Sequence, residues 1–144
     1  MRLEKSIIIQ QPVEVVFSFI TNMHNVPRWT PACEIRQVSE GPMQVGARFV
    51  QIVDVLRQKF EITTEITAHE PSRIFAFKAI SGPFPLENTF TFATVREGTL
   101  VTAVGEGEPG NVLKLASSLM ASVVKKQVET QLSLLKRILE AETT

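Results

Sequence analysis

The chain has 144 residues, of which 44% are hydrophobic and 21% are charged, a balance typical of one globular domain with a hydrophobic core. Fifteen basic and fifteen acidic residues cancel to a formal net charge of zero, so no basic excess exists to attract nucleic acid. The single cysteine, Cys33, excludes an intramolecular disulfide, and no Cys/His pair has the spacing of zinc ligands. We therefore predict one domain spanning residues 1–144, with no metal and no other cofactor.

Membrane insertion is also not expected. No apolar run approaches the roughly 20 residues that a spanning helix needs, and the first residues lack the apolar core of a signal peptide. These observations predict a cytoplasmic protein.

The first third of the chain predicts a strand followed by two short helices. Leu3 to Gln10 is rich in β-branched residues, which favour a strand. Pro12 opens a helix in the position where proline is preferred. A second helical segment, Asn22 to Trp29, is interrupted by Pro27. The apolar face of the first helix comprises Val13, Val16, Phe17 and Ile20.

After Pro31, about seventy residues have the patterning of consecutive antiparallel strands. The charged members of each strand mark its outer face, because successive side chains point to opposite sides. His69 to Ser72 is predicted as a turn, and Arg96 to Thr99 as a tight hairpin with Gly98 in a left-handed conformation. The predicted inward side chains are Phe49, Gln51, Val53, Val55, Phe60, Ile62, Thr64, Ile66, Phe75, Phe77, Ala79, Asn88, Phe90 and Phe92.

The end of the chain predicts one long helix from about Asn111 to Glu140. Asn111 is a suitable N-cap, and no proline or glycine occurs from Val112 to Glu140. At 1.5 Å per residue the helix is about 43 Å long, more than a small core usually accommodates. Such a helix fits across a large curved sheet, and the space between them is a natural ligand site. Its apolar stripe contains Leu113, Ala116, Met120, Val124, Val128, Leu132, Leu135 and Leu139.

Four short motifs in this order resemble the polyketide cyclase/dehydratase and lipid-transport-like family of the START-like (helix-grip, SRPBCC) superfamily. They are Ile9 to Phe17 (IQQPVEVVF), Asn25 to Pro31 (NVPRWTP), Glu70 to Arg73 (EPSR) and Gly98 to Thr102 (GTLVT). The resemblance covers essentially the whole chain. It implies an α+β helix-grip fold, in which a strongly bent antiparallel sheet wraps around the C-terminal helix and leaves an apolar cavity. Family members bind lipids, sterols or polyketides, and some cyclise or dehydrate polyketides.

The predicted ligand-binding residues line this cavity, for which we expect a volume of about 300 Å3. Two alternatives stay open for Trp29, which either caps the mouth of the cavity or fills the junction between helices and sheet. The polar residues Gln51, Thr64, Asn88 and Gln131 either orient a ligand or bond to one another. The predicted set is Trp29, Phe49, Phe60, Ile62, Phe75, Phe77, Asn88, Phe90, Phe92, Leu115, Leu119, Met120, Val123 and Val124.

No catalytic residue is assigned. His24 and His69 are the only histidines, and neither has a partner at a recognisable spacing. Glu61 and Glu65 fall on the outer phase of their strand, and Cys33 is expected to be packed rather than nucleophilic.

The sequence therefore favours a module that binds a hydrophobic small molecule without chemistry. The alternative is a polyketide cyclase/dehydratase-type enzyme that uses the same cavity, and a protein-interaction module shares the fold. The sequence leaves a homodimer open.

Overall fold

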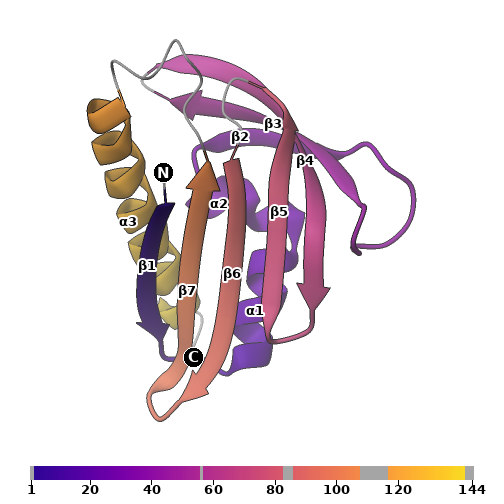
Figure 1. Ribbon diagram of the computed structural model, residues 1–144. Coiled ribbons are helices and arrows are strands. Elements are labelled where there is room, and N and C mark those ends of the chain that lie inside the picture. Colours follow the sequence, from indigo (N-terminus) through magenta and orange to yellow (C-terminus); the bar gives the residue numbers. More distant parts are fainter. Residues whose placement is uncertain (1, 56, 83–85, 108–116, 142–144) are drawn as a thin grey trace.

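The computed structural model describes residues 2–55, 57–82, 86–107 and 117–141, except the side chains at 55, 117–121 and 123. One strand and three short helical segments are followed by six further strands and a C-terminal helix (Figure 1). The elements are β1 (Arg2–Ile9), α1 (Val13–Thr21), a 3-10 turn η1 (Met23–Asn25), α2 (Val26–Trp29), β2 (Ala32–Gln37), β3 (Arg48–Val55), β4 (Gln58–Glu70), β5 (Ile74–Ser81), β6 (Leu86–Val95), β7 (Gly98–Gly107) and α3 (Ser117–Ala141).

The strands form one seven-stranded antiparallel sheet in the order β1-β7-β6-β5-β4-β3-β2. Strands β2 to β7 are neighbours in sequence order, whereas β1 pairs with β7, so that Leu3 lies opposite Gly105 and Ile9 opposite Thr99. The sheet bends, and α1, α2 and α3 lie on one side of it, with α3 alongside β1 (Figure 1). This architecture confirms the predicted α+β helix-grip fold.

The inner face of the sheet carries the apolar phase predicted from the charge pattern. The cross-strand pairs Phe49–Thr64, Phe75–Phe90 and Phe92–Val101 place these side chains on that face. Glu65, on the opposite phase, forms outer-face ion pairs with Arg48 at 3.4 Å and Lys78 at 4.0 Å. The most deeply buried side chains, which join sheet and helices into one core, are Ile9, Val16, Ile20, Ile66, Phe75, Thr99, Val101, Leu135 and Leu139.

The turn predicted from His69 to Ser72 begins two residues too early, because β4 continues to Glu70 and the turn spans residues 71–73. The register shifts between Ile66 and Ala68, so one extra residue enters the strand. An extra residue reverses the alternation of side chains, and His69 therefore faces inward rather than lying on the surface. Its ring contacts Phe17 and Phe75, with centroid distances of 5.5 and 6.2 Å.

The expected packing of Cys33 is also wrong, and a second irregularity explains it. The register of β2 against β3 shifts between Ala32 and Glu34, so Cys33 is the extra residue. Its side chain is exposed, and its thiol donates to the carbonyl oxygen of Ile52 at 3.4 Å.

The C-terminal part of α3 packs tightly against the sheet. Leu132, Leu135 and Leu139 are at most 4% exposed and belong to the core. Val128, one turn earlier, is only partly buried. The predicted start of this helix at Asn111 lies outside the described residues.

Hydrogen bonds hold the C-terminal end of α3 to β1 and to Gln10 and Gln11, the two residues that follow β1. Lys136 Nζ donates to the Ile8 carbonyl oxygen at 2.7 Å and to Glu140 Oε2 at 2.8 Å. The Gln10 backbone N–H donates to the same Glu140 oxygen at 2.9 Å, and Gln11 Nε2 donates to the Leu139 carbonyl oxygen at 2.7 Å. These bonds, here called the C-terminal latch, fix the helix end over the edge of the sheet.

Gly98 fixes the hairpin between β6 and β7 against the end of β1. Its φ is +142°, a conformation that other L-residues rarely adopt. A Cβ there would collide with the Ile9 carbonyl oxygen and lie 3.0 Å from Gln10 Cα. The glycine predicted at this hairpin therefore serves a close approach of two backbones as well as a turn.

Replacing Glu140 by glutamine tests the C-terminal latch. The hydrogen bonds from Lys136 and from the Gln10 N–H lower the pKa of the Glu140 carboxyl. A lowered pKa in the folded state stabilises the protein above the unfolded carboxyl pKa, and this contribution is lost as the pH falls through the folded value. We expect Glu140→Gln to lower the unfolding free energy by roughly 0.5–1 kcal/mol near pH 7 and to have a shrinking effect at acidic pH. Denaturant unfolding of both proteins across the acid range measures this.

Glu97→Gln is the control for the latch experiment. Glu97 is exposed in the β6–β7 turn and has no ion pair within the part of the chain that the structure describes. An effect of Glu140→Gln that stayed constant with pH, or matched that of Glu97→Gln, would contradict the prediction.

Trp29 belongs to the core, where only 5% of it is exposed. Its ring meets the Phe90 ring edge-on at a centroid distance of 6.0 Å. We expect Trp29→Ala to cost roughly 3–5 kcal/mol of unfolding free energy, because a large buried ring leaves a cavity behind. Thermal and denaturant unfolding measure the loss, and an unchanged melting temperature would refute the packing role.

Candidate functional site

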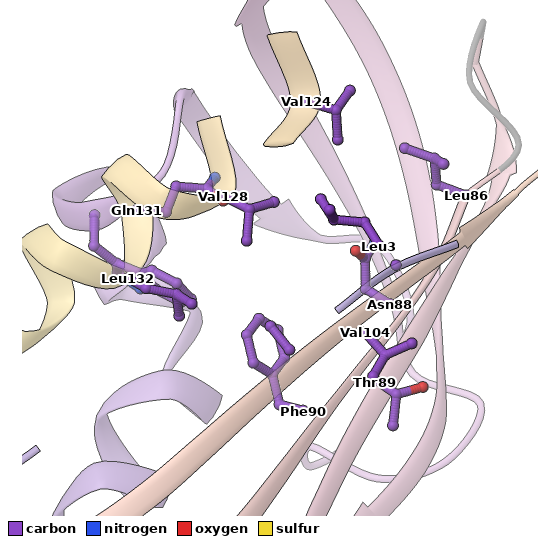
Figure 2. Close-up of a pocket in the computed structure, with 13 residues that line it drawn as sticks. Leu3, Leu86, Asn88, Thr89, Phe90, Val104, Val124, Val128, Gln131 and Leu132 are labelled. Carbon is purple, nitrogen blue, oxygen red and sulfur yellow. The ribbon is translucent and has the colours of Figure 1, made fainter. Parts of the chain in front are cut away.

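An apolar pocket lies between the middle of α3 and the strands β1, β7 and β6. In Figure 2, Val128, Gln131 and Leu132 of the helix face Leu3, Asn88 and Phe90 of the sheet across it. Trp29 of α2 completes the wall. The lining residues are Leu3, Trp29, Leu86, Asn88, Thr89, Phe90, Ala103, Val104, Gly105, Val124, Val128, Gln131 and Leu132.

Four residues of the predicted ligand-binding set line this pocket: Trp29, Asn88, Phe90 and Val124. Six others lie elsewhere on the inner face of the sheet. Among these, Phe49, Phe75 and Phe92 are buried in the core, while Phe60, Ile62 and Phe77 are partly buried. The side chains of Leu115, Leu119, Met120 and Val123 lie outside the described residues.

A row of aromatic rings connects the core to the pocket wall. Phe75 contacts Phe77 at a centroid distance of 5.8 Å, and Phe77 stacks on Phe90 at 6.3 Å. Phe90 in turn meets Trp29. Offset and edge-on ring pairs restrict one another's orientation, so this row positions the two aromatic side chains that the pocket presents.

Sequence reasoning missed the contribution of β1 and β7 to the pocket. Ala103 and Gly105 of β7 have small side chains at alternate positions, which leaves space above that strand. A Cβ added to Gly105 would lie 3.5 Å from Asn88 Oδ1, directly beside the pocket. The sequence did contain a signal for this space, because small residues recur at every second position of β7. The charge pattern did not show which face of β7 points inward.

The pocket holds about 60 Å3, far less than the predicted 300 Å3. The large side chains Trp29, Phe90, Val128 and Leu132 all border this space. This volume accommodates a few water molecules, whereas pockets for larger organic ligands usually exceed about 300 Å3.

The polar groups of the inner face divide into two sets. Gln51 Nε2 donates to Thr64 Oγ1 at 3.4 Å, and this hydroxyl contacts the Phe49 carbonyl oxygen at the same distance. Gln51 and Thr64 therefore bond to one another, and neither lines the pocket. Asn88 and Gln131, in contrast, line the pocket from β6 and α3.

The electrostatic character of the pocket is neutral. Of its thirteen described lining residues, none carries a charged or titratable side chain. An ion pair of 2.9 Å joins Lys5 of β1 to Glu129 of α3, the residue after Val128 of the lining. Hydrogen bonding and attraction by Lys5 lower the pKa of the Glu129 carboxyl, and the pair is a second link between α3 and the edge strand.

The predicted acid–base candidates lie away from this pocket. His24 lines an open, polar groove on the outer side of β2 to β4, together with Cys33 and Glu61. His69 packs between phenylalanine rings. In the described ranges no three potential ligand side chains gather around a metal position. Within the same ranges, no helix combines the length and apolar character needed to cross a membrane.

Several solved structures share this fold. A Thermus thermophilus protein, TTHA0849, is 19% identical over 100% of this chain and 99% of its own, with a TM-score of 0.81. A START superfamily protein from Mycobacterium smegmatis is 15% identical over 99% of each chain, with a TM-score of 0.80. The Zhui aromatase/cyclase from a Streptomyces species is 14% identical over 100% of this chain and 96% of its own, with a TM-score of 0.81.

These similarities establish the fold alone. The comparison with curated protein sequences gave no match. The model of one protein family, described as polyketide cyclase / dehydrase and lipid transport, matches residues 1–140. The chain, with its bent sheet, its C-terminal helix and the apolar pocket between them, therefore belongs to the polyketide cyclase / dehydrase and lipid transport family.

Proposed function

We propose that the protein binds a hydrophobic small molecule, lipid- or polyketide-like, in the pocket between α3 and the sheet, and that it does so without catalysis. The observation that carries this proposal is the uncharged, mostly apolar lining at the helix–sheet junction. Catalysis of cyclisation or dehydration would require an acid or a base beside the substrate. The lack of a titratable side chain among the described lining residues therefore favours binding over the enzymatic alternative.

Binding requires the pocket to enlarge, because about 60 Å3 is too small for such a ligand. The burial of α3 suggests where this happens. Leu135 and Leu139 are fully buried and the C-terminal latch holds the same end, whereas Val124 and Val128 are only partly buried. Tilting α3 about its fixed C-terminal end would widen the space beside Val124 and Val128 and would stretch the Lys5–Glu129 ion pair beside them.

Filling the pocket from the helix tests the proposal. Val128→Phe adds a ring to the lining, and we expect it to weaken binding of the neutral apolar fluorophore N-phenyl-1-naphthylamine at least tenfold. The fold should survive, since the added ring enters existing space rather than a closed core. Fluorescence titration measures binding, and circular dichroism with thermal unfolding checks the fold.

Ser133→Phe is the matched control, because Ser133 is exposed on the same helix and does not line the pocket. It should leave binding within about twofold of the wild-type value. Equal binding by Val128→Phe and the wild-type protein would place the fluorophore elsewhere and refute the proposed site.

A further inference from the structure

Among the described residues, the indole N–H of Trp29 is a buried donor without an acceptor. Trp29 lines the pocket and is 5% exposed, and its Nε1 atom is inaccessible and has no hydrogen-bond partner in the described part of the chain. A buried donor that loses its bond to water and gains no other is destabilising, so native proteins rarely leave one unpaired. A residue of the pocket wall therefore carries a donor that no described protein group satisfies.

The packing of Trp29 uses its ring and not its N–H group. The ring belongs to the hydrophobic core and meets Phe90 edge-on, and neither contact involves the N–H. A second buried polar atom without a partner is Thr67 Oγ1, but Thr67 does not line the pocket. Among the described residues, the unsatisfied donor and the apolar pocket thus coincide only at Trp29.

Two amides extend this polar feature. Asn88 of β6 and Gln131 of α3 line the same pocket, and neither side chain bonds to the described part of the chain. Figure 2 shows them on opposite walls. Together with the indole they offer hydrogen bonds from three elements, with no charge among the described lining residues.

We infer that Trp29 is a specificity-determining residue, whose Nε1–H donates a hydrogen bond to an oxygen acceptor of an uncharged, otherwise apolar ligand. A carbonyl oxygen suits this role, because it accepts through lone pairs and adds no charge to desolvate. This inference rests on the proposed function and restricts it, because a hydrocarbon of the same shape would leave the indole unpaired and bind less tightly.

Nuclear magnetic resonance on the unaltered protein tests the inference. Trp29 is the only tryptophan, so its indole proton gives a single, unambiguous signal. Acetophenone and α-methylstyrene are suitable probes, because they share one skeleton and differ only in C=O against C=CH2. We expect both to perturb signals of pocket residues, and only the ketone to move the indole proton downfield, as hydrogen bonding does.

The outcomes separate the inference from the proposed function. If both probes bind and the indole proton responds equally to both, the inference is overturned while the pocket stands as a binding site. If neither probe perturbs the pocket, both proposals are overturned.

Two substitutions at Trp29 provide an independent measurement. Trp29→Phe retains a ring and removes the N–H, and replacing the tryptophan with β-(3-benzothienyl)alanine removes the N–H at nearly constant shape. We expect the ratio of ketone to alkene affinity to fall about tenfold in both proteins, the effect of one hydrogen bond. An unchanged ratio in the benzothienyl protein would overturn the inference, whatever the stability of Trp29→Phe.

Discussion

The site depends on the unequal attachment of α3 to the sheet. At its C-terminal end the helix is held by buried leucines and by the bonds of Lys136 and Glu140 to the end of β1. One to two turns earlier the contact loosens, and the pocket occupies the space above the small residues of β7. The buried leucine contacts and the pocket thus occupy different segments of one helix, and the Lys5–Glu129 ion pair links the pocket segment to β1. In the proposed function, the leucine segment supplies core stability and the pocket segment admits the ligand.

Much of the fold could be predicted because local signals agreed. Charged residues fixed the outer faces of β3 to β6, and the proline, glycine and long helical stripe located the boundaries between elements. The predicted directions of side chains were wrong where one extra residue in a strand altered the alternation of inward and outward side chains. The bulge before Ala68 turned His69 inward, and the bulge at Cys33 turned that side chain outward. Bulges depend on how two strands pair across the sheet, so the sequence of one strand does not reveal them.

The site was less predictable than the fold. A phenylalanine on the inner face either fills the core, as Phe75 does, or borders the pocket, as Phe90 does, and only the three-dimensional position decides. The volume of the pocket was overestimated for the same reason, because the phenylalanine rings that suggested a cavity themselves occupy space on the inner face. The pocket residues of β1 and β7 were not predicted. The space above β7 is created by small residues, which give little indication of which face of a strand points inward. Family membership does not resolve this, because one fold can carry different sites.

The C-terminal latch has a consequence for self-association. An open sheet has two edges, and an unprotected edge strand can pair with strands of other molecules. Strand β1 forms one of these edges and ends in Ile7, Ile8 and Ile9, a β-branched run well suited to such pairing. Lys136 occupies the Ile8 carbonyl oxygen and places a positive charge beside it. The end of α3 thereby occupies one acceptor of this edge and places a charge there, two features that disfavour pairing with a strand of another molecule.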